Sequence, residues 1–182
     1  SQDSPGPMTQ TVMQSALLLD VLTNKNEYAA AINLDSRLRI GIVRDWMTDN
    51  SEVNSLFDES IKKLEKSGLN LVEVNLSALE SQDHEDELVV LLYELAEEVK
   101  RYLSSRPGAR ISSLKDIVEF NRENSEVELK YFGQELFEKA LELEGKVSEY
   151  RDSRNRNKNW AEKTLNKGFE SVDILIGCTY GP

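Results

Sequence analysis

Two serine–lysine pairs are the first residues in this sequence whose spacing could support catalysis. Ser60 and Lys63, and likewise Ser112 and Lys115, follow the pattern Ser-x-x-Lys. A lysine activates a serine only when it has lost enough solvation to act as a base. The first pair falls on the polar face of an amphipathic stretch beside Lys62, and the second falls where a helix is expected to begin. We therefore interpret both pairs as structural.

The single histidine and the single cysteine limit the other catalytic sets. His84 lies among acidic residues at an expected helix start, so we interpret it as a solvated surface residue and not as part of a Ser–His–Asp triad or a metal site. Cys178 has no histidine nearby in the sequence and is expected to be a buried thiol. Nucleophile elbows, glycine-rich phosphate loops and His-Glu-x-x-His motifs do not occur. The sequence therefore assigns no catalytic residue, no metal and no organic cofactor.

The composition indicates an acidic globular chain. Its 182 residues include 33 Asp and Glu against 22 Lys and Arg, a formal net charge of -11. Such a charge argues against nucleic acid or an anionic membrane as a partner. One cysteine excludes an internal disulfide and is typical of a reducing compartment, so a cytoplasmic location is expected. Neither a signal peptide nor an apolar run of about 18 residues is visible.

Strand and helix patterns alternate in the first part of the chain. Thr9 or Thr11 is expected to cap an apolar helix that reaches Val21. Residues 38–43 and 69–74 are expected to be short strands, separated by a helix that runs from Ser51 to Gly68. This arrangement predicts parallel pairing with a right-handed crossover. The inward residues expected on the second helix are Val53, Leu56, Phe57, Ile61 and Leu64.

Helices dominate the rest of the chain. A capping box of Ser77 and Glu80 is expected before a long helix at residues 83–105. Further helices are expected after Ser113, at 135–152 and at 160–167, with an exposed turn at 151–158 and a third strand at 172–177. The inward stripe expected on the long helix is Leu88, Leu91, Leu92, Leu95, Val99, Tyr102 and Leu103. Together these patterns predict an α/β fold with a mostly parallel sheet core flanked by helices.

Four motifs carry a family resemblance. They are SQDSPGPMTQTV with ALLLDVL, then RLRIGIVRDWM, then FNREN with KYFGQELFEKA, and finally DILIGCTYGP. In this order they resemble the amidase signature family, in which the first motif usually runs D-x-x-GPM-x-RTV-x-DAALLLDVL. The resemblance covers residues 1–182 and corresponds to the C-terminal portion of a single amidase-signature domain. The YFGQELFEKA stretch is most similar to the branch of peptide amidases and acylamidases.

The resemblance implies hydrolysis of linear carboxylic amides through an acyl-enzyme. The family's Ser–cis-Ser–Lys triad would lie upstream of Ser1, so this chain alone is expected to be inactive. Its expected partners are a small-molecule amide substrate and the missing N-terminal half of the domain. The chain opens in a turn and closes in a loop after a strand, so the domain is expected to be truncated at both ends.

The resemblance also nominates site residues. Asn121, Tyr131, Phe132 and Gln134 correspond to the family's acyl-pocket region, where aromatic rings beside an amide suit an apolar acyl group with a polar end. The alternative is that both aromatic residues belong to the core and that Gln134 caps the next helix. Asp3 and Gly6 correspond to a segment that supports the active site. The alternative for Asp3 is that it caps a turn.

Several positions depart from the family pattern. Gln10 and Gln14 stand where the family usually has Arg and Asp, a pair that could form a salt bridge at i and i+4. Two amides keep a hydrogen bond possible at these positions and remove the charges. Asn124 occupies a position that is often His, and Cys178 one that is often Pro. None of these positions is catalytic in the family's mechanism.

Two other functions remain open. One is a subunit of a tRNA-dependent amidotransferase, which shares the GPM-x-RTV segment. The other is a non-catalytic fragment or complementation module, which would expose an apolar patch of more than a few hundred Å² where the missing half docks. Association into a homo-oligomer is compatible with either.

Overall fold

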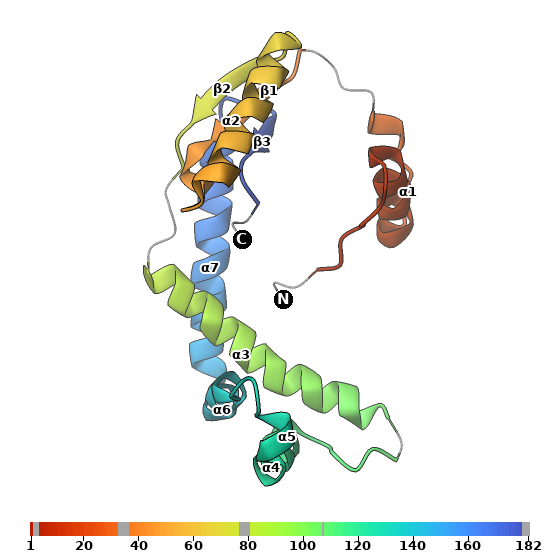
Figure 1. The fold of residues 1–182 in the computed structure, drawn as a ribbon, viewed down its shortest axis with the longest axis vertical. Coiled ribbons are helices and arrows are strands. Elements are labelled where there is room, and N and C mark those ends of the chain that lie inside the picture. Colours follow the sequence, from red (N-terminus) through yellow and green to blue (C-terminus); the bar gives the residue numbers. More distant parts are fainter. Residues whose placement is uncertain (2–3, 33–36, 77–80, 107, 180–182) are drawn as a thin grey trace. The chain divides into compact units, whose positions relative to one another are not determined.

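The computed structural model describes residues 1, 4–32, 37–76, 81–106 and 108–179, with the backbone alone at 81–83 (Figure 1). The chain divides into two compact units. The sheet unit comprises residues 2–78 and 163–182, and the helical unit comprises residues 79–162 together with Ser1. The expected capping box of Ser77 and Glu80 lies outside the described residues.

The sheet unit is built around three parallel strands, β1 (Arg39–Val43), β2 (Asn70–Val74) and β3 (Ile174–Ile176), in the order β2-β1-β3. The central strand β1 is buried at every position after Arg39, because it has a neighbour on each side. Its apolar run is typical of a parallel strand that is covered on both faces. The predicted parallel sheet is therefore confirmed.

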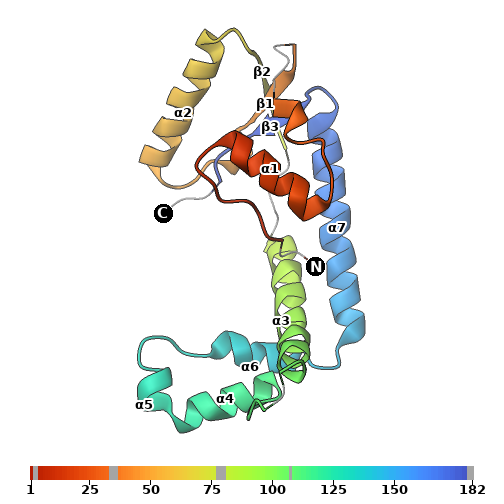
Figure 2. The same cartoon turned by 90° about the vertical axis from the view of Figure 1, so that its right-hand side faces the viewer.

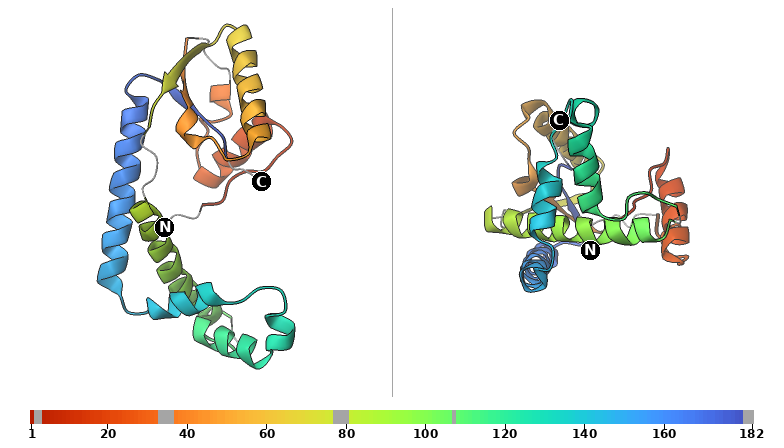
Figure 3. Two further views of the ribbon diagram at one scale, coloured as in Figure 1. Left: turned by 60° about the vertical axis from the view of Figure 1, so that its left-hand side comes forward. Right: turned by 90° about the horizontal axis from the view of Figure 1, so that it is seen from below.

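Helices cover both faces of this sheet. Helix α2 (Ser51–Lys66) lies along one face, and the last turns of α7 (Val147–Phe169) lie along the other (Figure 3). The side chain of Asn50 caps α2 by accepting the N–H groups of Glu52 and Val53, and Gly68 follows the helix at φ 76°. Ile61 is buried as predicted. The prediction that Leu56 points inward is wrong, because its side chain is 63% exposed.

A charged pair ties the starts of β1 and β3 together. The Arg39 guanidinium donates to both carboxylate oxygens of Asp173, from Nη2 at 2.8 Å and from Nε at 3.1 Å. The Arg39 backbone N–H also donates to Asp173 Oδ2 at 2.8 Å, and the Asp173 N–H donates to the Arg39 carbonyl. The guanidinium makes the largest contribution and this backbone N–H the second largest, and together they lower the pKa of Asp173 to about 2.

We predict that Asp173→Asn removes part of the acid sensitivity of the sheet unit. The folded pKa is about 2 and lies below the usual value, so the ionised carboxylate stabilises the fold above about pH 4. This contribution disappears as the pH falls toward 2. The difference in urea midpoint between the natural chain and Asp173→Asn should be largest near neutral pH and shrink in acid. A constant difference would contradict the prediction, and Glu170→Gln, an exposed neighbouring carboxylate, is the control.

Helix α1 (Val12–Thr23) also belongs to the sheet unit and begins where the sequence predicted. Thr11 is its N-cap, with its side chain accepting the Gln14 N–H. Gln14 Oε1 in turn accepts the Gln10 N–H at 3.2 Å, so the two glutamines keep a hydrogen bond through the Gln10 main chain. The helix ends at Asn24, which has a positive φ of 54°, and a short 3₁₀ helix, η1 (Ala30–Ile32), follows.

The helical unit contains α3 (Ser81–Ser104), α4 (Leu114–Glu123), α5 (Ser125–Glu128), α6 (Glu135–Glu142) and most of α7 (Figure 2). The buried core lies between α3, α4 and α6 and consists of Leu92, Leu114, Ala140 and Leu143. On α3, the expected inward placement of Leu88, Leu91 and Tyr102 is wrong, because all three are exposed. The side packed against the core instead presents Val89, Leu92, Tyr93, Leu95, Ala96 and Val99.

Two predicted boundaries near α7 are also wrong. The helix expected at 135–152 is interrupted, because Gly145 adopts a φ of 79° between α6 and α7. The turn expected at 151–158 is helical and forms part of α7. Within it, Arg156 donates two hydrogen bonds of 2.6 Å to the buried carboxylate of Asp86 on α3. This tertiary pairing holds a polar stretch in the helix.

Candidate functional site

Two side-chain amides of the nominated substrate-binding set are in direct contact. Asn121, on α4, donates from Nδ2 to Oε1 of Gln134, just before α6, at 3.2 Å. Gln134 is buried and donates from Nε2 to the Val118 carbonyl at 3.3 Å and to Glu138 Oε1 at 3.4 Å. Gln134 occupies the N-cap position of α6, but its side chain makes no capping bond. The amide pair therefore joins α4 to α6.

The two nominated aromatic residues lie at the surface. Tyr131 is 78% exposed and Phe132 is 84% exposed, so the alternative that they form core is wrong. The Lys130 ammonium lies 5.2 Å from the centre of the Tyr131 ring. Both rings lie within three residues of Gln134 in the chain.

We predict that Gln134→Ala lowers the free energy of unfolding of the helical unit by about 1–2 kcal/mol. The substitution leaves the Asn121 amide without its acceptor and removes a donor from the Val118 carbonyl, at a buried position where lost hydrogen bonds are costly. Urea unfolding of the purified chain measures the change. Gln10→Ala, at an exposed glutamine, should leave the midpoint unchanged, and equal midpoints for both variants would contradict the prediction.

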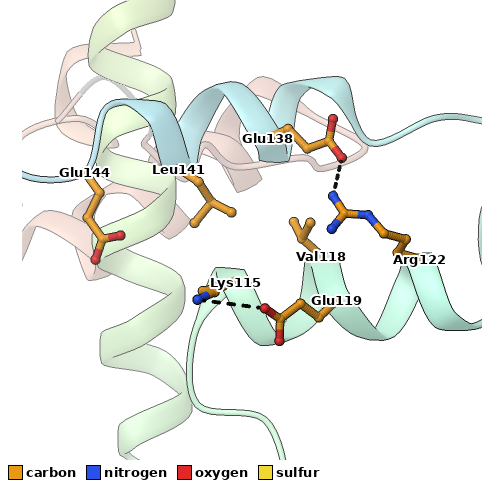
Figure 4. A pocket seen from close by; sticks show the side chains of 7 residues that line it. All are labelled: Lys115, Val118, Glu119, Arg122, Glu138, Leu141 and Glu144. Atoms are coloured by element: carbon orange, nitrogen blue, oxygen red, sulfur yellow. Dashed lines mark hydrogen bonds and ion pairs between the residues drawn. The ribbon is translucent and has the colours of Figure 1, made fainter.

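A groove of about 410 Å³ lies between α4 and α6 (Figure 4). We call it the α4–α6 groove; it is lined by Lys115, Val118, Glu119, Arg122, Glu138, Leu141 and Glu144. Its cations are paired, since Arg122 Nη2 lies 3.0 Å from Glu138 Oε1 and Lys115 Nζ lies 3.8 Å from Glu119 Oε1. Glu138 also contacts Gln134, so the groove adjoins the amide pair. None of the four nominated substrate-binding residues lines it.

The carboxyl ends of the parallel strands form a second candidate region, in the sheet unit. After β1, a short 3₁₀ helix, η2 (Arg44–Trp46), places the Asp45 carboxylate where it accepts the Leu76 N–H after β2. Trp46 packs on Gly177 after β3, where an added Cβ would lie 2.6 Å from Trp46 Cε3. Ligands of α/β sheets bind outside this edge. The half-buried Cys178 lies next to this contact.

The serines of the two Ser-x-x-Lys patterns do not pair with their lysines. The Ser60 hydroxyl donates to the Leu56 carbonyl at 2.8 Å. The Ser112 hydroxyl and N–H both donate to Asp116 Oδ2 at 2.7 Å, and these bonds hold the pKa of Asp116 below its usual value. The expectation that His84 is a surface residue is confirmed, because its side chain is exposed.

The active-site support residues are only partly described. Asp3 lies outside the described residues, whereas Gly6 is exposed and a Cβ added to it would have no atom within 4 Å. Among the residues with described side chains, no group of three or more metal-ligating residues gathers.

The model of the family described as Amidase matches residues 1–181. The chain belongs to the amidase family. This agrees with the motif order seen in the sequence and with the parallel sheet core.

Individual relatives of this amidase chain include two kinds of enzyme. A glutamyl-tRNA(Gln) amidotransferase subunit from Akkermansia muciniphila is 26% identical over 205 residues, which span 98% of this chain and 42% of the relative. Mandelamide hydrolase of Pseudomonas putida is 28% identical over 106 residues, which span 58% of this chain and 20% of the relative. Both kinds were anticipated by the resemblance.

Two solved structures share the fold. The crystal structure of PAM12A superposes with a TM-score of 0.75 at 26% identity, over 96% of this chain and 40% of that one. The native peptide amidase of Stenotrophomonas maltophilia gives a TM-score of 0.75 at 24% identity, over 93% of this chain and 39% of that one. The chain thus spans about two fifths of the length of these structures and of the Akkermansia muciniphila relative.

Sequence patterns missed three features of the site region in this amidase chain. The Arg122–Glu138 pair and the Gln134–Val118 bond each join residues 16 positions apart, one on α4 and the other on α6 or directly before it. The packing of Trp46 on Gly177 joins residues that are far apart in the sequence, one after β1 and the other after β3. Gly177 was a usable signal, since a glycine at a strand end can mark a close approach.

No helix in the part of the chain that the structure describes is both long enough and apolar enough to span a membrane.

Proposed function

We propose that this chain is part of an amidase that hydrolyses linear carboxylic amides through an acyl-enzyme. The family match over residues 1–181 carries this proposal. The Ser–cis-Ser–Lys groups would come from a part of the protein outside these 182 residues. Two observations support that division: the chain spans about 40% of the length of its relatives, and both Ser-x-x-Lys serines are bonded to other acceptors.

Within that enzyme, the chain would supply part of the acyl pocket and support for the active site. The exposed rings of Tyr131 and Phe132 beside the Asn121–Gln134 amide pair suit an apolar acyl group that carries a polar end. Asp3 and Gly6 would support the active site from the segment before α1. A cytoplasmic location goes with this proposal, since the chain has one half-buried cysteine.

The test compares two proteins, the gene product in which this sequence naturally occurs and the 182-residue chain. Each is incubated with a panel of simple linear amides, and ammonia release is measured. Hydroxylamine is then added, because an acyl-enzyme transfers its acyl group to this nucleophile and yields a hydroxamate. We expect hydrolysis and hydroxamate from the gene product alone. Hydrolysis by the 182-residue chain would contradict the division of catalytic groups, and inactivity of both would favour a non-catalytic module.

A second candidate function is that of an amidotransferase subunit. The relative from Akkermansia muciniphila and that from Acinetobacter baylyi, 27% identical over 96% of this chain, are both named as glutamyl-tRNA(Gln) amidotransferase subunits. Such a function would require a charged tRNA and a partner protein of the same complex. Amide hydrolysis by the gene product in the absence of both would favour the first proposal, and strict dependence on both would favour the second.

A further inference from the structure

The side-chain amide of Gln134 has a fixed orientation within the helical unit. Its Nε2 faces two acceptors, the Val118 carbonyl at 3.3 Å and Glu138 Oε1 at 3.4 Å, and its Oε1 accepts from Asn121 Nδ2 at 3.2 Å. Glu138 is itself held by Arg122 (Figure 4). Because a carbonyl oxygen can only accept, the Gln134 amide cannot turn over without losing its bond to Val118. Gln134 is buried and donates both of its side-chain N–H groups, so it has no donor left for a ligand.

The orientation of Gln134 also fixes the side-chain amide of Asn121. Since Gln134 Oε1 is an acceptor, the Asn121 atom that faces it must be the nitrogen, and the Asn121 carbonyl oxygen Oδ1 faces elsewhere. Asn121 is half-buried, and its Oδ1 accepts no hydrogen bond from any group in the part of the chain that the structure describes. The pair therefore leaves one oriented acceptor, Asn121 Oδ1, for a ligand.

The segment that carries the two exposed rings ends at this amide pair. Tyr131 and Phe132 lie within three residues of Gln134. An extended chain advances at most about 3.6 Å per residue, so the Cα atoms of both residues lie within about 11 Å of that of Gln134. The main chain of residues 130–133 makes no hydrogen bond to any other described residue. The Gln134 side chain therefore ties the end of this segment to α4.

We infer that Asn121 Oδ1 accepts a hydrogen bond from the polar end of the acyl group, and that Gln134 is a positioning residue that orients Asn121 without touching the substrate. This inference rests on the proposed function, because that function places the acyl group at these residues. It adds the chemistry of the polar end, which must donate, as a hydroxyl or an N–H group does. The substrate class is then a linear amide whose acyl group is apolar and carries one such donor.

The experiment measures kcat/KM of the natural gene product for the monohydroxylated derivatives of hexanamide and for the matching monofluorinated derivatives. Fluorine is close to a hydroxyl in size but cannot donate, so the ratio of the two values isolates the donated hydrogen bond. We expect a ratio of about 3 to 10 at one carbon of the acyl chain, which is the worth of one hydrogen bond. The difference should lie in KM, because the bound substrate and the transition state make this bond alike.

Three variants of the gene product assign the roles. Asn121→Leu removes the acceptor, and Gln134→Met removes the bond that orients it while filling the same space. Both should bring the ratio to about 1, since either change costs the single hydrogen bond. Asn124→Leu is the matched control, because it makes the same change at an exposed position three residues further along, and it should keep the ratio. Urea midpoints verify that each variant is folded.

The outcomes separate this inference from the proposed function. A ratio near 1 at every carbon overturns the inference, and so does a ratio that survives Asn121→Leu or is lost in Asn124→Leu. A ratio lost in Asn121→Leu but kept in Gln134→Met overturns the positioning role. The same ratio is also measured as dissociation constants by equilibrium dialysis, which needs no turnover. A ratio seen in binding without any hydrolysis overturns the proposed function alone, and hydrolysis with a ratio near 1 overturns the inference alone.

Discussion

Leu114→Ala is expected to lower the free energy of unfolding of the helical unit by about 2–5 kcal/mol. Leu114 is the first residue of α4 and is only 2% exposed. It belongs to the buried cluster with Leu92 of α3, Ala140 of α6 and Leu143 directly after α6. Truncation removes buried apolar surface and leaves a cavity where three helices meet. The loss is a large share of the stability of a typical domain.

The measurement is urea unfolding followed by the fluorescence of Trp160, which lies in the helical unit, on a Trp46→Phe background. Leu136→Ala is the matched control, because the same truncation on α6 falls at a side chain that is 53% exposed. Its effect should stay within about 0.5 kcal/mol. Equal losses in the two variants would show that the cluster is not the core of this unit.

Gly41→Ala is expected to destabilise the sheet unit by about 1–3 kcal/mol through overpacking. Gly41 is the middle residue of the central strand β1 and pairs with Val72 and Leu175. An added Cβ would lie 2.8 Å from both Val172 Cγ2 and Val74 Cγ2, and 2.9 Å from Leu175 Cδ2. Valine side chains are stiff at χ1 and cannot move aside without moving the backbone. Because Gly41 has no side chain, the side chains of Val172, Val74 and Leu175 can pack closely on β1.

For Gly41→Ala the reporter is Trp46 in the sheet unit, on a Trp160→Phe background. Gly6→Ala is the control, because a Cβ at position 6 has no atom within 4 Å and should leave the transition in place. The urea midpoint of the helical unit, measured by the fluorescence of Trp160 on a Trp46→Phe background, should also stay unchanged. A shift of similar size in Gly6→Ala, or no shift in Gly41→Ala, would contradict the overpacking argument.

Local signals in the sequence predicted much of the fold. The Thr11 cap, the helix start at Ser113, and Gly68 after α2 all depend on signals within a few residues. The parallel sheet followed from short apolar runs separated by a helix, because two parallel strands need a long connection. The order of the motifs indicated the amidase family, which the match over residues 1–181 shows.

Contacts between distant residues explain where those predictions failed. An apolar stripe indicates that a helix has a buried side, but not which of two apolar sides faces the core, so Leu88 and Leu91 were assigned to the wrong side of α3. The polar stretch at 151–158 remains helical in part because Arg156 pairs with Asp86, 70 residues away. Asp20 reads as a polar residue in an apolar helix, yet it is buried because three backbone N–H groups turn toward it.

The candidate site shows the same contrast between what local sequence signals predict and what contacts between distant residues determine. Residue types and resemblance to a family motif are visible in a sequence, and they were enough to nominate Asn121, Tyr131, Phe132 and Gln134. The sequence did not show that the two amides bind each other while the two rings face solvent; this is seen in the fold. The physical reason is that hydrogen-bond satisfaction at a buried position depends on which helices meet there. The exposure of Val21 on α1 has the same origin, since a sequence shows that a helix is apolar but not whether anything covers it.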